Sequence, residues 1–206
     1  MKTLLTALII AISFGSFAQT RIGTVSAFQI VEKEVRQGDM VLYYPREPVR
    51  VEGSLWLTLE LDDQRSLSTF MELTDDNRKK IIEILEAYNK LKNVVETPQK
   101  LPGSYNIGQV TVRAAFSDNN QYHLAPAQNI LFYVKFDKNG NKTLAMAIGK
   151  MTSKTHPNIT HTVPLLWFND VMVYDFASEI SDGNVASFMR HKGKTIDAGA
   201  LELMGK

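Results

Sequence analysis

The chain has 206 residues, with 23 lysine and arginine side chains against 22 aspartate and glutamate side chains, and it contains no cysteine. The lack of cysteine excludes disulfides, thiolate metal sites, a cysteine nucleophile and a lipid-modified N-terminal cysteine. A nearly neutral charge without a basic run argues against nucleic acid or an anionic membrane surface as the main partner.

The first eighteen residues have the pattern of a secretory signal peptide. Lys2 supplies a positive start, residues 4–12 are an almost unbroken apolar run, and Ser16 and Ala18 place small residues before a cleavage site. The apolar run is shorter than the roughly 20 residues that a membrane-spanning helix needs. We therefore predict cleavage between Ala18 and Gln19 and a periplasmic or secreted protein of 188 residues. An exported protein of this size without disulfides favours a bacterial envelope.

The N-terminal third of the mature chain predicts β-hairpins. Residues 29–36 and 40–44 flank Gln37-Gly38-Asp39, which we interpret as a turn. Leucines at every second position from 55 to 61 indicate a strand with one apolar face, and residues 67–73 are expected to return as its partner.

The middle of the chain predicts one long amphipathic helix. Thr74 is a suitable N-cap, and apolar residues recur at helical spacing through residues 75–96 before Thr97-Pro98 ends the helix. We interpret the apolar stripe as core packing rather than as a partner-binding surface. The stretch 97–103 is a possible weak domain boundary, although a helix that crosses one sheet explains it equally well.

The C-terminal half again predicts strands. Alternation over 110–116 and 130–136 is followed by Asn139-Gly140, which is typical of a tight hairpin turn, and by a further strand through 144–148. Residues 164–176 suggest a last hairpin or one long bulged strand. A short helix is expected from Asp182 to His191 with Ser181 as its cap.

These elements predict an α+β fold built mainly on an antiparallel β-sheet, either a meander or sandwich-like. One long amphipathic helix would pack on the sheet, and a short helix would lie near the C-terminus. We expect a single soluble domain over residues 19–206. It is not expected to be an integral membrane protein, because several strands carry charged or polar residues on both faces.

The sequence gives few indications of a catalytic or ligand-binding site. It has no nucleophile elbow, phosphate-binding glycine loop, dinucleotide fingerprint or HExxH zinc motif. In an antiparallel meander, however, the long connections 117–127 and 151–163 would lie at the same end of the sheet, opposite the turn at 137–141. They carry a candidate ligand-binding set of one tyrosine and three histidines: Tyr122, His123, His156 and His161.

Two interpretations of these residues stay open. Three converging neutral imidazoles could bind zinc with an open position, which would make the protein a metal-dependent hydrolase with a site on 117–127 and 151–163. Otherwise the histidines are ordinary solvated loop residues, and Tyr122 with its polar neighbours binds a partner. We favour an exported binding or accessory protein that is not catalytic and needs no cofactor. Its partner would be a protein, polymer or small ligand of the envelope.

Overall fold

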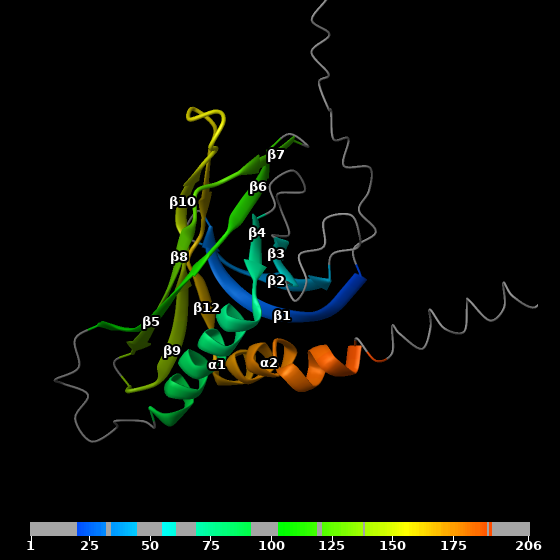
Figure 1. Cartoon of the computed structure of the whole chain (residues 1–206). Helices are drawn as coiled ribbons and strands as arrows, with labels where there is room; N and C mark the ends of the chain where they lie inside the picture. Colours follow the sequence, from blue (N-terminus) through cyan, green and yellow to red (C-terminus); the bar gives the residue numbers. More distant parts are fainter. Residues whose placement is uncertain are drawn as a thin grey trace, which may run out of the picture.

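The computed structural model describes residues 20–31, 34–44, 55–60, 69–91, 103–118, 121–137, 139–188 and 190. It has an α+β fold in which a large antiparallel sheet is covered at one end by helices (Figure 1). The strands are β1 (Thr20–Val31), β2 (Glu34–Tyr44), β3 (Leu55–Glu60), β4 (Thr69–Leu73), β5 (Ser104–Val112), β6 (Ala114–Asp118), β7 (Gln121–Leu124), β8 (Gln128–Phe136), β9 (Lys142–Ala147), β10 (Gly149–Thr152), β11 (Thr160–Val163) and β12 (Leu166–Phe168). The helices are α1 (Asp75–Lys90), α2 (Asp170–Glu179) and a further helix over residues 182–188. The predicted α+β class and mainly antiparallel sheet are confirmed.

The sheet is a meander that closes on itself. Ten strands follow the order β5-β8-β9-β12-β1-β2-β3-β4-β6-β7. Strands β5 and β6 follow one another in the chain and are separated only by Arg113. Because β5 pairs with β8 at one end of this order and β6 pairs with β4 near the other end, the sheet closes on itself. The pairing is therefore that of a meander rather than of two stacked sheets.

Two long hairpins extend beyond the closed part of the sheet. The first is formed by β5 and β6 against β7 and β8, with Val112 opposite Gln128 and Ala115 opposite Leu124. The second is formed by β9 and β10 against β11 and β12, and Gly149, with a φ of 84°, lies where β9 gives way to β10. Positive φ is accessible to glycine at little cost, so this residue lets the second hairpin change direction.

Alternation along the strands builds one contiguous core inside the closed sheet. In the middle of β8 every second residue is fully buried, namely Ile130, Phe132 and Val134. The same alternation on β3 buries Leu55, Leu57 and Leu59. Burial of these side chains supplies the main stabilising term of the fold, at about 1.5–3 kcal/mol each.

Helix α1 begins where the sequence predicts. Oγ1 of Thr74 accepts a hydrogen bond from the backbone N of Asn77 at 3.2 Å, as expected for an N-cap. The buried face includes Ile81, Leu85 and Tyr88. The helix ends at Lys90, earlier than the predicted end at 96, and residues 92–102 lie outside the described part of the chain.

The prediction of a strand through 164–176 is wrong beyond residue 168. Oδ1 of Asn169 accepts from the backbone N of Met172 at 2.9 Å, and this cap starts helix α2. Val173, Phe176 and Ile180 are fully buried and are spaced three and four residues apart, which is helical spacing. Val171 and Tyr174, which belong to the same apolar run, are exposed on the helix.

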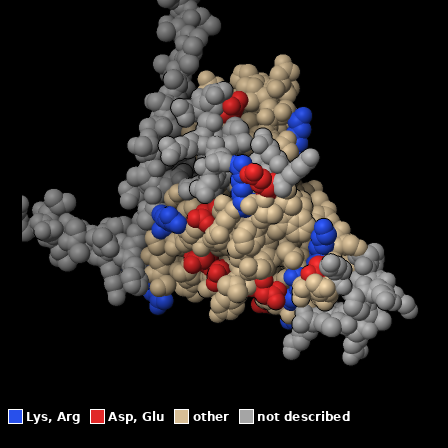
Figure 2. Space-filling model, turned by 180° about the vertical axis from the view of Figure 1, so that it is seen from behind, with Lys and Arg blue, Asp and Glu red and all other residues tan. Residues whose placement is uncertain are grey.

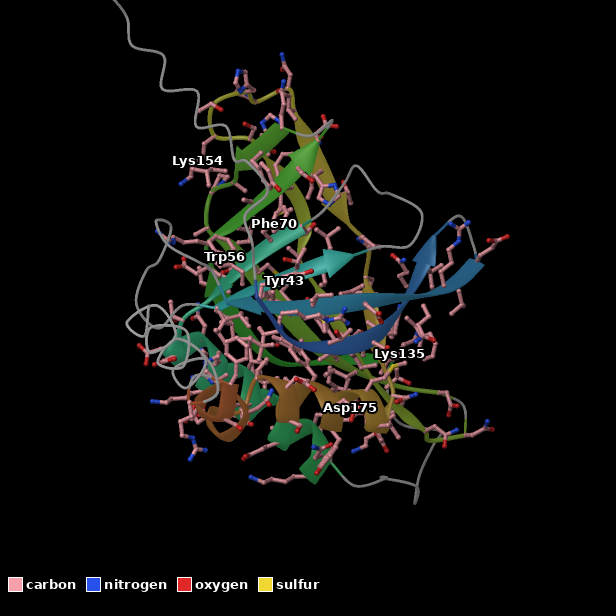
Figure 3. The ribbon with its side chains drawn as sticks, turned by 90° about the vertical axis from the view of Figure 1, so that its right-hand side faces the viewer. Tyr43, Trp56, Phe70, Lys135, Lys154 and Asp175 are labelled. Atoms are coloured by element: carbon pink, nitrogen blue, oxygen red, sulfur yellow. The ribbon has the colours of Figure 1, made fainter. Side chains whose placement is uncertain are left out.

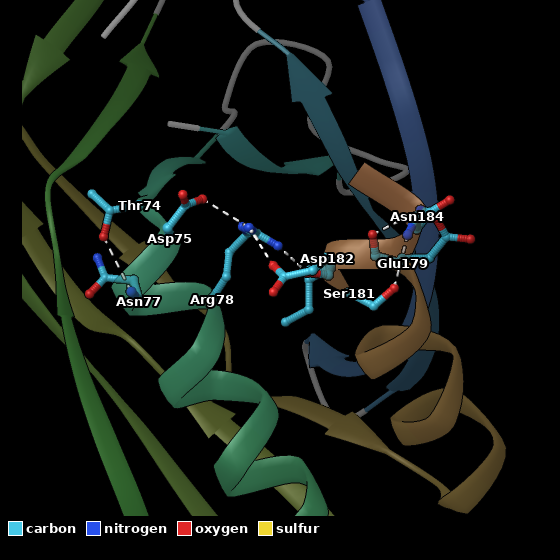
Figure 4. Close-up of polar contacts among 9 residues, drawn as sticks. Thr74, Asp75, Asn77, Arg78, Glu179, Ser181, Asp182 and Asn184 are labelled. Carbon is cyan, nitrogen blue, oxygen red and sulfur yellow. Dashed lines mark hydrogen bonds and ion pairs between the residues drawn. The ribbon is translucent and has the colours of Figure 1, made fainter. Parts of the chain in front are cut away.

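The predicted short helix after Ser181 is present over residues 182–188, and a buried arginine connects it to α1 (Figure 4). Oγ of Ser181 accepts from the backbone N of Asn184 at 3.2 Å. The side chain of Arg78 is 4% exposed and donates to the carbonyl of Ile180 at 2.7 Å and to Oδ1 of both Asp75 and Asp182 at 2.8 Å. These bonds satisfy a helix-end carbonyl and neutralise a buried charge.

The first predicted hairpin has its turn in the wrong place. Residues 37–39 lie inside strand β2, with Ala27 opposite Gly38 and Ser26 opposite Asp39, and the pairing of β1 with β2 continues to Val31 opposite Glu34. Oγ of Ser26 donates to Oδ1 of Asp39 at 3.0 Å and accepts from Nε2 of Gln37 at 3.2 Å. Cross-strand hydrogen bonds thus keep a turn-like Gln-Gly-Asp sequence extended.

Candidate functional site

The ends of the two long hairpins meet, as predicted from a meander. The backbone N of Lys154 donates to the carbonyl of Leu124 at 2.9 Å, which joins the second hairpin to the first. In Figure 1, β7 and β10 lie at the end of the molecule opposite the helices. The connections 117–127 and 151–163 are not simple loops, because they contain β7 and β11. We call β6, β7 and residues 149–163 the hairpin tip.

The structure brings the three predicted histidines to this tip. His123 on β7 and His161 on β11 are only 5% and 6% exposed, and both rings pack against the ring of Phe116. Ring centroids are 5.2 Å apart for Phe116 and His123 and 5.6 Å apart for Phe116 and His161. His156, in the exposed segment between β10 and β11, lies edge-on to His123 at 6.1 Å. Two of the three histidines are therefore core residues rather than solvated loop residues.

Threonine hydroxyls bind two of the imidazole rings. Nε2 of His161 lies 2.8 Å from Oγ1 of Thr69 on β4, and both residues are buried. Nδ1 of His156 lies 2.9 Å from Oγ1 of Thr155. Burial lowers the pKa of His161 below its ordinary value of 6.5, and the negative charge of Asp118 opposes this effect as the smaller cause. His161 is consequently neutral at pH 7.

This arrangement differs from a three-histidine zinc site. Such a site needs three ring nitrogens directed at one point about 2.0–2.1 Å away. Here the rings of His123 and His161 both pack against Phe116, and Nε2 of His161 is hydrogen-bonded to Oγ1 of Thr69. Within the described residues, no group of three or more histidine, aspartate or glutamate side chains is placed to hold a metal ion.

Tyr122 faces outward, on the opposite side of β7 from His123. It is 52% exposed, and its neighbour on the same face, Leu124, is 66% exposed. The Tyr122 ring packs at 5.4 Å from that of Phe70 on β4. In Figure 3, Phe70 lies close to Trp56 and Tyr43, on the outer face of β4, β3 and β2. The predicted residues thus divide into an outer surface at Tyr122 and an inner cluster at His123 and His161.

Sequence reasoning missed the residues that organise this cluster. Phe116 was assigned to an apolar strand face, and nothing marked its ring as the one that both histidines contact. Thr69 gave no signal, because its partner His161 is 92 residues away in the chain. Only the pairing of β4 with β6, which places Thr69 opposite Phe116, brings these side chains together.

The described surface carries both signs of charge. Figure 2 shows lysine and arginine side chains interspersed with aspartate and glutamate on one face. One pair is partly buried: the carboxylate of Glu72 is 3% exposed and accepts from Nε of Arg113 and from its Nη2 at 2.7 Å. The hydrogen bond to Glu72 raises the pKa of Arg113. None of the described helices has the length and apolar character needed to cross a membrane.

No protein-family model, curated protein or solved structure matches this chain.

Proposed function

We propose that this protein is an exported binding or accessory protein without catalytic activity, periplasmic or secreted after cleavage between Ala18 and Gln19. Its partner is a protein, polymer or small ligand of the bacterial envelope, bound at the hairpin tip. The observation that carries the proposal is the convergence of the ends of two successive hairpins on one surface. Tyr122, Leu124 and His156 are exposed together there.

The composition of this surface suits recognition. An exposed tyrosine offers a large rigid area at low entropic cost, with a hydroxyl that can form hydrogen bonds. The outer face of β7 adds the aliphatic side chain of Leu124, and Lys154 and His156 are exposed on the adjoining hairpin. Strand β7 belongs to the ten-stranded sheet, so Tyr122 and Leu124 are held by a rigid support.

The burial of Thr69 favours binding over catalysis. A hydroxyl 2.8 Å from an imidazole nitrogen is the arrangement of an activated nucleophile and its base. Thr69, however, is 2% exposed and His161 is 6% exposed, so a substrate cannot reach either group in this conformation. Their contact instead connects β11 to β4 within the core.

Site-specific photo-crosslinking in cells tests the proposal. Tyr122 is replaced by the photoreactive amino acid p-benzoylphenylalanine, which preserves an aromatic ring, and Tyr174 on α2, 70% exposed, is replaced in a matched control. We expect an adduct of defined mass at position 122, from the envelope fraction, and none at position 174. The proposal is wrong if position 122 gives no adduct or if both positions give the same adducts with equal yield.

A further inference from the structure

We propose that His161 is a proton-sensitive latch, whose protonation releases the β10–β11 hairpin from β4 and opens the interior of the sheet at the hairpin tip. A role for this opening in regulating ligand binding rests on the proposed function. The pH-dependent opening itself does not.

The β10–β11 hairpin is separate from the ten-stranded sheet. Its strands pair with each other through four residue pairs, from Gly149 opposite Val163 to Thr152 opposite Thr160. Strand β1 pairs with β12 only at Trp167 and Leu166, and this pairing does not continue along β11. Among the described residues, the hairpin is hydrogen-bonded to the rest of the tip from the backbone N of Lys154 to Leu124 and between His161 and Thr69, and its Met151 and Val163 pack in the core. A hairpin that lies outside the main sheet can open locally without global unfolding.

A positive charge on His161 would be poorly stabilised in the closed position. One face of its ring is stacked on Phe116, with 24° between the ring planes, and its cross-strand neighbour Met151 is fully buried. Thr69, the neighbour on β4, is uncharged. An unpaired charge in such apolar surroundings is costly unless the group moves into water.

The other ionisable groups near the latch do not offset this cost. Asp118 on β6 favours the charged form, but its effect on the pKa of His161 is smaller than that of burial. On β7 the nearest ionisable group is His123, which lies against the same Phe116 ring. The hairpin itself contributes exposed side chains with positive charge or none, namely Lys150, Lys154 and His156.

The sign of the pH effect follows from linkage. Burial lowers the pKa of His161 in the closed state, whereas a solvated ring in the open state titrates near 6.5. The open state therefore binds more protons, and the closed state loses stability as the pH falls through about 6.5. One such group can raise the opening equilibrium by up to about tenfold for each pH unit below that value.

Opening would change the chemistry of the tip. Phe116 and Met151, fully buried in the closed state, would become accessible together with His123. A polar entrance would then lead to an apolar interior, which suits an amphipathic partner in an acidic environment.

Amide hydrogen exchange at pH 7.5 and 5.5, corrected for intrinsic exchange rates, tests the latch. In the wild-type protein we expect the opening constant of residues 149–163 to rise by up to about tenfold at pH 5.5, while residues 130–136 in β8 do not change. His161→Gln keeps a polar group near Thr69 but cannot be protonated, so it should abolish the rise. His156→Gln, a change at the exposed histidine, should preserve it.

A second variant covers the case in which His161→Gln does not fold. Thr69→Val removes the hydroxyl but retains His161, so residues 149–163 should open several-fold more at pH 7.5 and still respond to pH. A wild-type hairpin with the same protection at both pH values would overturn the latch. So would a pH response that persists in His161→Gln, or a Thr69→Val hairpin insensitive to pH. Crosslinking at position 122 is a separate readout, so failure of the latch can be distinguished from failure of the proposed binding function.

Discussion

Individual buried polar residues stabilise the helix-covered end of the molecule, and Tyr88 is the clearest case. It is fully buried, and its hydroxyl donates to Oδ1 of Asp170 at 2.7 Å, with the carbonyl of Lys142 at 3.3 Å. Nζ of Lys142 lies 4.2 Å from the centroid of the Tyr88 ring and donates to the Tyr88 carbonyl at 3.0 Å. Three elements, α1, β9 and α2, are thereby joined at one side chain.

Tyr88→Phe should change the stability of the protein at alkaline pH. Burial, followed by the hydrogen bond and the charge of Asp170, raises the pKa of Tyr88 above its ordinary value of 10.0. The folded state therefore retains a proton that the unfolded state releases, and stability is lost as the pH rises above about 10. We expect Tyr88→Phe to cost about 1–2 kcal/mol at pH 7 and to lose less stability than the wild type between pH 9 and 11. Urea denaturation across this range measures both effects.

The control for this prediction is Tyr174→Phe, at a tyrosine 70% exposed on α2. It should leave both the stability and its pH dependence unchanged. An identical alkaline loss in the wild type and in Tyr88→Phe would mean that Tyr88 does not titrate on unfolding.

Residue-scale sequence reasoning identified which side chains gather at the hairpin tip but not how they are oriented. A strand assignment for residues 121–124 would have placed Tyr122 and His123 on opposite faces, because neighbouring residues alternate. Treating 117–127 as a loop removed that constraint. The burial of His161 depends on Thr69 and Phe116, which are distant in sequence and could not be inferred from local spacing.

At the scale of elements, the contact between α1 and β5 depends on a residue without a side chain. The register of β5 against β8 shifts between Asn106 and Gly108, and Oδ1 of Asn106 accepts from the backbone N of Gly108 at 2.9 Å. A Cβ added to Gly108 would lie 2.6 Å from Cγ1 of Ile84 on α1. Gly108 therefore allows the helix to pack closely against the strand.

Gly108→Ala should destabilise the protein by about 1–3 kcal/mol, the usual cost of overpacking a core contact. Gly103→Ala is the matched control, because a Cβ there would have no heavy atom within 4 Å. The double variant Gly108→Ala/Ile84→Ala should show less than the sum of the two single losses, because shortening Ile84 removes the clash. Denaturant unfolding of the wild type, Gly108→Ala, Ile84→Ala and the double variant gives the coupling energy between the two positions. Strict additivity would show that the two side chains do not compete for space.

Some elements were predictable because their signals are local. Thr74 sits at the start of α1, and Oδ1 of Asp137 accepts from the backbone N of both Asn139 and Asn141 in the turn between β8 and β9. Helix α2 was missed because residues 171–176 form a short, nearly continuous apolar run that also suits a buried strand. Its caps and its buried spacing at 173, 176 and 180 were the better signal.

At the scale of the whole molecule, export is a prediction from the sequence alone, because residues 1–19 lie outside the described part of the chain. We expect the protein recovered from the envelope or the medium to begin at Gln19. Ala18→Phe should block cleavage, because signal peptidase requires a small residue at this position. Intact mass measurement of both proteins is decisive: an unprocessed wild-type chain retained in the cytoplasm would refute the signal peptide.

Closure of the sheet could not be read from the sequence. Strand β1 contributes to it by pairing with β2, its neighbour in the chain, and with β12, about 140 residues later. The second pairing covers only Phe28 opposite Trp167 and Gln29 opposite Leu166. Local alternation indicates that a strand exists and which face is buried, but the choice of a partner so far away depends on the collective packing of the core.

The helices and the hairpin tip lie at opposite ends of the molecule (Figure 1). Near its start, β1 lies against α2, because a Cβ on Gly23 would meet the side chain of Glu179, and the last helix, 182–188, lies at the same end of the molecule, away from β7 and β10 (Figure 1). A surface, label or fusion partner attached at either of these points would therefore leave the hairpin tip pointing outward. Immobilised in this orientation, for example in a binding assay, the protein would present its exposed tyrosine to the solution and keep its helices against the support.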